Sequence, residues 1–417
     1  MNRYVREAAE VGLLPRVGGQ AIERLLGVQP VVVVMGARQV GKSTLVRALS
    51  ALADHRYVSL DDLEARGLAQ RSPMDLLTLA SRMTIDEVQR EPDLMFAIKR
   101  EVDSAPRRRP GRFVLTGSAN LLLMRKVSET LAGRAGYITL WPLTRGERLG
   151  LGRAGIWSDL FEAPSTEWAD VVRDSSRERT DWRDEAIRGG YPTPAHELTS
   201  PQDRSHWFSG YVQTYLERDL QDLAAVDSLV HFQRVMRAAC LRLGSLVNQS
   251  EISRDVGVSQ PTVHRWLNLL ETSFQLVRVE PYAVNRTKRL VKSPKLYWSD
   301  TGLALHLAGS DPGGAHLENL VLADLLAWRD VQIDRPAILY WRTSSGEEVD
   351  LVVESKRGLL AIEIKSGRRV SMRDVASLRT FRDEYRDLCL GGLLLHDGTA
   401  VEPMGDGIVA APWWKIL

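Results

Sequence analysis

The chain has 417 residues, of which 44% are hydrophobic and 26% charged; this excludes a disordered or fibrous protein and allows roughly three domains. Its formal net charge of +2 excludes a uniformly basic protein, so contact with a polyanion would need a local basic patch. The two cysteines, Cys240 and Cys389, lie far apart and outside any CxxC pair, which argues against a zinc knuckle or a disulfide framework.

The beginning of the chain does not have the pattern of a targeting segment. Residues 1–10 carry charges throughout and contain no apolar core of a signal peptide. The longest strongly apolar run, 31–35, is far too short to cross a bilayer. We therefore expect a cytoplasmic protein without a membrane segment.

After a polar helix within residues 1–30, short apolar strands alternate with amphipathic helices. We expect strands at 31–36, 57–60, 83–88 and 112–117, and helices at 41–53, 75–82 and 93–103. This alternation predicts an α/β fold class, a parallel sheet that is covered by helices on both faces.

A phosphate-binding loop is predicted between the first strand and the first helix. The sequence GARQVGKS fits the pattern G-x-x-x-x-G-K-[ST], and the strand before it and the helix after it are the context that this motif requires. Backbone N–H groups would surround the phosphates, Lys42 would reach the outer phosphates and the Ser43 hydroxyl would bind Mg²⁺. The expected nucleotide-binding residues are Gly36, Ala37, Arg38, Gln39, Val40, Gly41, Lys42, Ser43 and Thr44.

Two acidic residues end the strand in MTIDEVQ. We expect Asp86 to hold Mg²⁺ and Glu87 to orient or deprotonate the attacking water. Taken alone, the pair would fit the N-terminal cap of a helix, but its place after a phosphate loop favours the catalytic interpretation. Polar residues also end the next strand in RFVLTGSAN, where either Thr116 or Ser118 would sense the γ-phosphate; alternatively Ser118 or Asn120 caps the following helix.

These motifs together resemble one protein family. The segments GARQVGKSTL, TIDEVQ, FVLTGSAN and ETLAGRAGYITLWPLTRGE are similar to AAA-type ATPases of bacteria and archaea that carry a C-terminal domain of unknown function. RGGYP, TYLERDL, KSPKLYWSDTGLA and GEEVDLVVES extend the resemblance almost to the end of the chain. It implies ATP and Mg²⁺ as cofactors and Arg134, in LAGR, as an arginine finger or sensor. The alternative for Arg134 is a surface arginine that pairs with Glu129.

A helix-turn-helix is predicted in SEISRDVGVSQPTVHRWLNLL. Gly257 would form the turn, Ser259 the N-cap and Pro261 the first turn of the second helix. The basic segment 285–295 would form the wing of a winged helix and contact phosphates. The alternative is a packing module with a solvated basic face. The expected core consists of Ile252, Val256, Val258, Val263, Trp266 and Leu267, and the expected base-reading face of Gln260, Thr262, His264, Arg265 and Asn268.

The C-terminal part resembles the PD-(D/E)xK nuclease fold. Asp350 and Glu363 lie in neighbouring apolar strands, and Lys365 shares a face with Glu363 because strand side chains alternate. With Glu318 from the preceding helix they would form a second Mg²⁺ site. The alternatives are a polar hairpin whose acids pair with Lys365 or Arg342, or a nuclease-like fold that only binds.

We therefore predict four units: an AAA-type P-loop domain at 1–165, a connector and helical lid at 166–225, a winged-helix-like unit at 226–310 and a nuclease-like domain at 311–417. The leading hypothesis is an ATPase that couples nucleotide state to a C-terminal module engaging double-stranded DNA. A homo-oligomer would follow if Arg134 acted on a neighbouring subunit. The alternatives are a regulatory protein-binding switch with a slow ATPase, and an active Mg²⁺-dependent nuclease.

Overall fold

The valine run of β1 (Val31–Gly36) lies inside a five-stranded, all-parallel sheet in the order β2-β3-β4-β1-β5. The computed structural model describes residues 12–104, 109–118, 130–219, 228–284 and 293–417. The other elements of this first unit are α2 (Val17–Leu26), α3 (Lys42–Ala48), η1 (Ser50–Leu52), β2 (Arg56–Ser59), α4 (Leu63–Arg71), α5 (Pro73–Thr78), β3 (Met83–Asp86), η2 (Val88–Arg90), α6 (Leu94–Ser104), β4 (Phe113–Ser118) and β5 (Ala135–Thr139).

Alternate residues of β1 supply two separate cores. Val32 and Val34 belong to the apolar cluster that includes residues of α2 and α3, whereas Val31 and Val33 belong to the cluster that includes residues of α5 and α6. Side chains of a strand point alternately to its two faces, so the continuous valine run indicates a strand that is covered on both sides. The predicted α/β sheet is confirmed for this unit.

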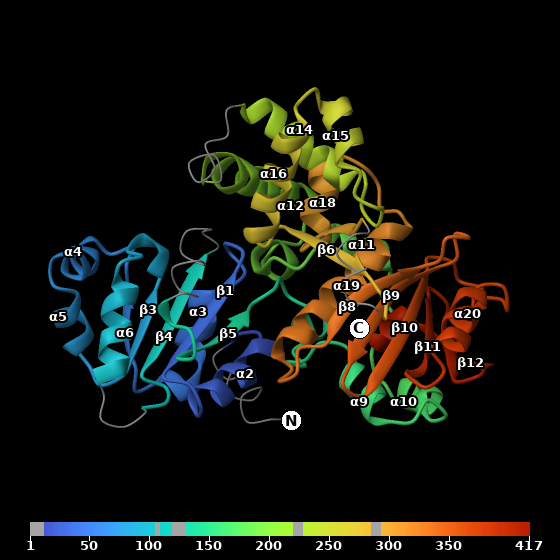
Figure 1. Ribbon diagram of the computed structural model, residues 1–417, viewed down its shortest axis with the longest axis horizontal. Helices are drawn as coiled ribbons and strands as arrows, with labels where there is room; N and C mark the ends of the chain where they lie inside the picture. Colours follow the sequence, from blue (N-terminus) through green and yellow to red (C-terminus); the bar gives the residue numbers. More distant parts are fainter. Residues whose placement is uncertain (1–11, 105–108, 119–129, 220–227, 285–292) are drawn as a thin grey trace.

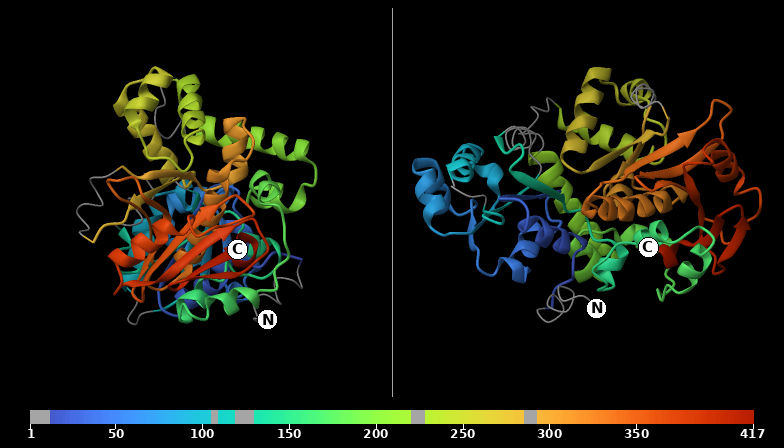
Figure 2. Two further views of the ribbon diagram at one scale, coloured as in Figure 1. Left: turned by 90° about the vertical axis from the view of Figure 1, so that its right-hand side faces the viewer. Right: turned by 60° about the horizontal axis from the view of Figure 1, so that its bottom comes forward.

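A mostly helical part follows. Its helices are α8 (Arg145–Arg148), α9 (Trp157–Glu162), α10 (Trp168–Arg173), α11 (Trp182–Arg188), η3 (Thr193–Glu197), α12 (Pro201–Tyr211), η4 (Val212–Asp219), α14 (Leu229–Cys240), α15 (Gln249–Val256), α16 (Gln260–Thr272) and α18 (Thr301–Ala308). Of these, α12, α14, α15 and α16 rise above the two sheets of the molecule (Figures 1 and 2).

The stretch 166–225, which we expected to form one connector and lid, is divided between two neighbours. The ring of Trp168 in α10 packs beneath Gly391 of the C-terminal sheet, so closely that a Cβ at Gly391 would lie 2.7 Å from it. In contrast, α11 and α12 contact α18. Figure 1 accordingly shows α9 and α10 below the C-terminal sheet and α12 in the upper helical part. Burial of the Trp157 and Trp168 side chains explains this split, because each indole removes a large apolar surface from water.

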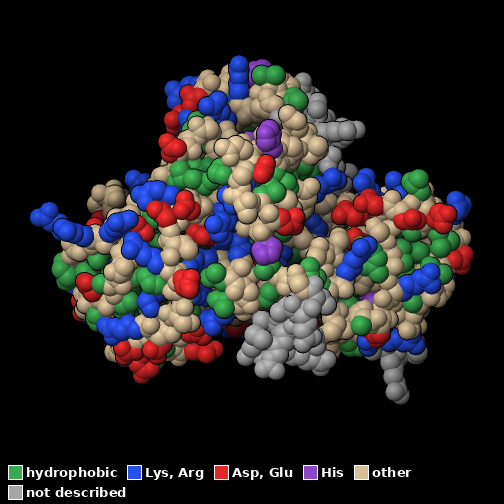
Figure 3. All heavy atoms as spheres, turned by 180° about the vertical axis from the view of Figure 1, so that it is seen from behind, with side chains coloured by type: hydrophobic (Ala, Val, Ile, Leu, Met, Phe, Trp, Pro, Cys, Tyr) green, Lys and Arg blue, Asp and Glu red, His purple; other side chains and the backbone are tan. Residues whose placement is uncertain are grey.

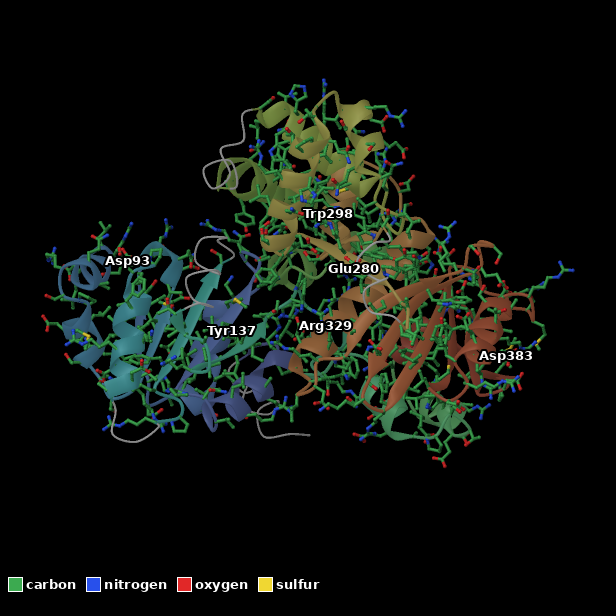
Figure 4. The ribbon with its side chains drawn as sticks, viewed as in Figure 1. Asp93, Tyr137, Glu280, Trp298, Arg329 and Asp383 are labelled. Atoms are coloured by element: carbon green, nitrogen blue, oxygen red, sulfur yellow. The ribbon has the colours of Figure 1, made fainter. Side chains whose placement is uncertain are left out.

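A second sheet crosses the predicted boundary at residues 310–311. It has eight strands in the order β12-β13-β11-β10-β9-β8-β6-β7. Its edge pair β6–β7 belongs to the predicted unit 226–310. Figure 4 labels Glu280 on β6 and Trp298 on β7, where the upper helices meet this sheet. Its elements are β6 (Leu276–Pro281), β7 (Lys295–Trp298), α19 (Gly314–Val331), β8 (Ala337–Arg342), β9 (Glu348–Ser355), β10 (Gly358–Lys365), α20 (Ala376–Glu384), β11 (Cys389–His396), β12 (Glu402–Gly405), β13 (Ile408–Pro412) and α21 (Trp413–Ile416).

The helix α19 lies between the two sheets, and its Arg329 is labelled there in Figure 4. It contacts α2 and β5 on one side and β8 and β10 on the other. The Trp141 indole, just after β5, donates a 2.8 Å hydrogen bond to Asp330 of this helix. In the described ranges of the chain, no helix combines the length and apolar character that a bilayer span requires.

Candidate functional site

The loop between β1 and α3 adopts a shape that its glycines make possible. Gly36 has φ +147°, and a Cβ there would lie 2.2 Å from the carbonyl oxygen of Leu140, so that only glycine fits. Gln39 and Gly41 are left-handed, with φ 61° and 91°. Left-handed residues within a loop turn successive backbone N–H groups toward one concave side, which is how phosphate-binding loops hold an anion.

The remaining loop residues anchor this cradle. Ala37 and Val40 are buried in the core beneath it. The buried Arg16 guanidinium donates a 2.7 Å hydrogen bond to the Val40 carbonyl and pairs with Glu147 at 3.0 Å. Gln39 and Thr44 are exposed. The loop is therefore held from behind while its outer side stays accessible.

Lys42 lies folded over the loop. Its ammonium donates hydrogen bonds to the carbonyls of Gly36 at 3.1 Å and Ala37 at 2.7 Å, and the residue is 5% exposed. Burial lowers its pKa to about 8, against the opposing influence of Glu87 and Asp86. This ammonium is thus poorly solvated and held beside the cradle.

Asp86, at the end of β3, is the centre of a hydrogen-bond cluster. The Ser43 hydroxyl donates to its Oδ1 at 3.0 Å, and the Thr116 hydroxyl donates to the same oxygen. The Tyr57 hydroxyl donates to Oδ2 at 2.5 Å. Burial, together with the bond to Asp86, raises the pKa of Tyr57 to about 12. Ser43 and Asp86 offer the hard oxygen atoms that Mg²⁺ prefers, and this ion commonly takes one or two carboxylates besides phosphate oxygens and water. These residues therefore fit Mg²⁺.

Glu87 follows in a left-handed conformation with φ 57°. The Gln89 amide donates to the Glu87 carboxylate and, at 2.7 Å, to the Ser118 hydroxyl. Thr116 therefore contacts Asp86, whereas Ser118 is connected to Glu87 through Gln89; Asn120 lies outside the described residues. Sequence reasoning missed Tyr57, which belongs to no recognised motif, and gave no role to Gln89, which ends the segment TIDEVQ.

Arg134 lies far from these residues. Its carbonyl accepts a 3.2 Å hydrogen bond from the N–H of Val31, at the beginning of β1, while the phosphate loop begins at the other end of that strand. The two ends of β1 are roughly 17 Å apart, so Arg134 and the phosphate loop lie at opposite ends of the strand. The Arg134 guanidinium pairs with Asp103 at 2.5 and 3.0 Å. The expectation that Arg134 acts in its own phosphate site is wrong for this structure, and action on a neighbouring subunit stays a prediction.

A cavity of about 390 Å³ adjoins the phosphate loop. Gly41, Thr44 and Leu45 form its wall at the beginning of α3, and Leu13 and Pro192 are among the residues opposite. Apolar walls beside a phosphate cradle are suited to the base and sugar of a nucleotide.

The helix-turn-helix geometry follows the sequence. Gly257 ends α15 in the left-handed conformation, and the Ser259 hydroxyl caps α16 through the N–H of Thr262. The expected core side chains Ile252, Val256, Val263, Trp266 and Leu267 are buried, and Val258 is partly buried.

The predicted base-reading face is less open than expected. The Asn268 side chain bonds to His264 at 2.9 Å and accepts from Arg278 at 2.7 Å. Gln260, His264 and Arg265 are exposed, and Thr262 is half-buried. On the face shown in Figure 3, basic and acidic side chains are interspersed over the described residues. This mixture gives that face no extended surface of one sign for a polyanion.

Most of the predicted basic wing, 285–292, lies outside the described residues. Its last cation, Lys295, is not on a wing surface: it begins β7 and is 2% exposed. Its ammonium pairs with Glu348 and lies 3.6 Å from Oδ1 of Asp350. The expectation that Lys295 contacts phosphates is wrong, because β7 pairs into the C-terminal sheet and turns this side chain inward.

The four residues of the nuclease-like pattern do gather around this lysine. Tyr297 donates a 3.0 Å hydrogen bond to Glu318, and the Lys365 ammonium lies 2.6 Å from Glu363. Burial raises the pKa of Glu318 and of Glu363, and the charge of Asp350 adds to both shifts. Among the described residues, however, no group of three or more His, Cys, Asp or Glu side chains is arranged to hold a metal ion. A second Mg²⁺ site at Glu318, Asp350 and Glu363 therefore stays a prediction.

Comparison with known proteins assigns three segments of the chain to family models. Residues 28–149 match the model of an AAA domain, and residues 179–313 and 313–416 match two domains of unknown function, DUF8612 and DUF4143. Among solved structures, the Walker-type ATPase paby2304 of Pyrococcus abyssi aligns over 69% of this chain and 94% of its own, with 15% identity and a TM-score of 0.42.

Two bacterial relatives extend the similarity along the sequence. An uncharacterised protein of Haemophilus influenzae is 23% identical over 67% of this chain and 65% of its own. The uncharacterised protein Rv2008c of Mycobacterium tuberculosis is 32% identical over 95% of this chain and 83% of its own length. The chain belongs to the same family as this mycobacterial protein, and within that family it carries an AAA-type P-loop domain.

Proposed function

We propose that this protein binds ATP with Mg²⁺ at the β1–α3 loop and hydrolyses it. The observation that carries the proposal is the meeting of the Ser43 hydroxyl and the Asp86 carboxylate, 3.0 Å apart, beside a glycine-shaped loop and the Lys42 ammonium. Backbone N–H groups and Lys42 would bind the phosphates, and the adjoining cavity would take the nucleoside. The AAA-domain match over this segment supports the proposal.

The residues around Asp86 would each have a separate task. Ser43 and Asp86 would hold Mg²⁺, which neutralises phosphate charge, while Thr116 and Tyr57 fix the Asp86 carboxylate through its two oxygens. Glu87 would orient the attacking water and accept its proton. Gln89 binds Glu87 in the structure and would have to release it for that step.

A finer proposal is that nucleotide state is transmitted to the helix-turn-helix segment. The Arg38 guanidinium lies 5.3 Å from the ring centre of Tyr215, and the Tyr211 hydroxyl donates to the Arg38 carbonyl at 3.5 Å. Tyr211 in turn bonds to Tyr191 at 2.9 Å and to Gln275, between α16 and β6, at 3.1 Å. Movement of the loop on nucleotide binding would reach α16 along these contacts, and exposed Gln260, His264 and Arg265 would engage duplex DNA.

A steady-state ATPase assay tests these proposals together. We expect Mg²⁺-dependent release of phosphate that EDTA abolishes, and absence of turnover at any protein concentration would contradict ATP hydrolysis. Stimulation by duplex DNA that declines with salt would support the DNA proposal, because phosphate contacts release counterions. A specific rate that rises with protein concentration would support action of Arg134 on a neighbouring subunit.

The pH dependence of ATP binding is a further prediction. Phosphates favour the charged form of Lys42, so binding must raise its pKa from about 8 and take up a proton above that pH. Affinity is therefore full below pH 7 and falls as pH rises through 8. Calorimetry should show about tenfold weaker binding at pH 9 than at pH 7. A Lys42→Arg variant, whose guanidinium keeps its charge, should lose this slope; an unchanged slope in that variant would contradict the role of Lys42.

A further inference from the structure

A buried ionic cluster lies where β7, α19, β9 and β10 meet. It contains four carboxylates and two ammonium groups: Glu318, Glu348, Asp350, Glu363, Lys295 and Lys365. The cluster opens toward solvent at Lys365, whose side chain is 41% exposed, and at Glu348, whose side chain is 28% exposed. None of these residues takes part in the proposed ATP site.

Lys295 occupies the interior of this cluster. Its side chain is 3% exposed, and its ammonium pairs with Glu348, lies 3.6 Å from Asp350 and lies 5.6 Å from the ring centre of Tyr340. Burial lowers the pKa of Lys295, but the charges of Asp350, Glu318 and Glu348 outweigh this effect and raise that pKa above its usual value. A buried charge is stable only if it is paired, and this lysine is paired on several sides.

The carboxylates are correspondingly arranged around an ammonium group. Oδ2 of Asp350 accepts the Ile364 N–H at 2.8 Å, which leaves Oδ1 to face Lys295. Oδ1 therefore contributes negative charge 3.6 Å from the Lys295 ammonium. Oε2 of Glu363 is buried and has no hydrogen-bond partner among the described residues, although the other oxygen of that carboxylate binds Lys365. Within the described chain, the cluster thus contains one carboxylate oxygen without a partner, Oε2 of Glu363, beside the Asp350 carboxylate that faces Lys295.

We propose that Lys295 is the resident cation of this pocket: its ammonium stands in place of a divalent metal ion, and its removal turns the pocket into a divalent-metal site. The nuclease-like set of Glu318, Asp350 and Glu363 does not fit Mg²⁺ in this structure because Lys295 already supplies their positive partner. Carboxylate oxygens are ligands that suit Mg²⁺ and Mn²⁺.

The origin of Lys295 gives this arrangement a structural link. The lysine belongs to β7, which pairs with β6 through Val279 and forms a bridge with Leu246, between α14 and α15. The cation therefore comes from the predicted unit 226–310, whereas Glu318, Asp350 and Glu363 come from the C-terminal part. The charge of the pocket depends on how these two parts are joined.

Manganese binding to the full chain without nucleotide tests the proposal. The comparison uses the unmodified protein, Lys295→Met, Lys295→Met combined with Asp350→Asn, and Lys356→Met as a matched control, since Lys356 is 79% exposed and pairs only with Asp334 among the contacts at its ammonium. Free Mn²⁺ is measured by electron paramagnetic resonance. We expect Lys295→Met to gain one bound Mn²⁺, held at least about tenfold more tightly than by the unmodified chain, and the double variant to lose it. Lys356→Met should bind like the unmodified chain.

Three results would overturn the proposal. The first is a folded Lys295→Met variant that binds no more Mn²⁺ than the unmodified chain. The second is an unmodified chain that binds an equivalent of Mn²⁺ which the single variant Asp350→Asn, measured beside it, removes, because metal and Lys295 would then coexist. If Lys295→Met unfolds without metal, Mn²⁺ should restore its thermal transition, and failure to restore it also counts against the proposal.

Discussion

Replacement of Lys42 by alanine is expected to weaken ATP binding about a hundredfold. The ammonium lies beside the glycine-shaped cradle, and the loss of one charged hydrogen-bonding group costs about 3 kcal/mol. Calorimetric titration with ATP and Mg²⁺ measures this change directly. Because the cradle is made of backbone N–H groups, residual weak binding of phosphate is expected in the variant.

The control for this variant is Lys356→Ala, which removes a lysine from an exposed ion pair with Asp334. Surface pairs of this kind contribute little to stability, so ATP affinity and melting temperature should both stay unchanged. The Lys42→Ala variant loses the hydrogen bonds from Lys42 to the carbonyls of Gly36 and Ala37. A cooperative thermal transition is therefore required to show that the variant is folded. Undiminished ATP affinity in a folded Lys42→Ala protein would remove the β1–α3 loop from the proposed function.

Replacement of Glu87 by glutamine is expected to abolish turnover while ATP binding is retained. A positioned general base contributes about 10²- to 10⁴-fold to a rate, and the amide cannot accept a proton at neutral pH. The amide can still form a hydrogen bond with Gln89, so the local structure should persist. Steady-state kinetics should therefore show kcat reduced by at least about a hundredfold, with the dissociation constant for ATP changed by less than about threefold.

Glu64→Gln provides the matched control, because Glu64 is an exposed acid in the first turn of α4. The same change of charge there should leave kcat unaltered. If Glu87→Gln keeps full kcat, Glu87 is not the base. If it loses ATP binding as well, the carboxylate has a structural task, and the separation of roles between Asp86 and Glu87 would need to be revised.

Local patterns were sufficient to predict four of the five strands of the first sheet. The valine run of β1 and the strands ending at Asp86 and Ser118 are each defined by consecutive residues, and the phosphate loop has a motif with strict geometric demands. In contrast, β5 was not predicted. Its sequence, AGYIT, is short and contains a glycine, and it becomes a strand because it pairs with β1. That pairing also fixes the edge of the sheet on which Arg134 lies.

In the C-terminal part, residue spacing predicted which side chains lie together but not that Lys295 would be buried among them. Strand alternation predicted that Asp350, Glu363 and Lys365 lie together, and in the structure Asp350 accepts a 2.8 Å hydrogen bond from the N–H of Ile364, which lies between the other two residues in β10. Lys295 was expected in a solvent-exposed wing because it ends a basic run. Its burial depends on β6 pairing in parallel with β8, a contact between residues about 60 positions apart, Glu280 and Leu339. Tyr57 likewise reaches Asp86 only because β2 pairs with β3.

The eight-stranded sheet has a consequence for how this protein is divided. Similarity to DUF4143 begins at residue 313, yet the sheet that contains this segment starts with β6 at Leu276. A fragment cut at 313 would leave β8 as a bare edge, with backbone groups open to pairing with another chain. The fragment would also leave the carboxylates of Asp350 and Glu348 without the Lys295 ammonium that lies beside them in the full chain. The segment that matches DUF4143 is thus smaller than the unit in which the β8 edge is paired and the buried carboxylates have their ammonium partner.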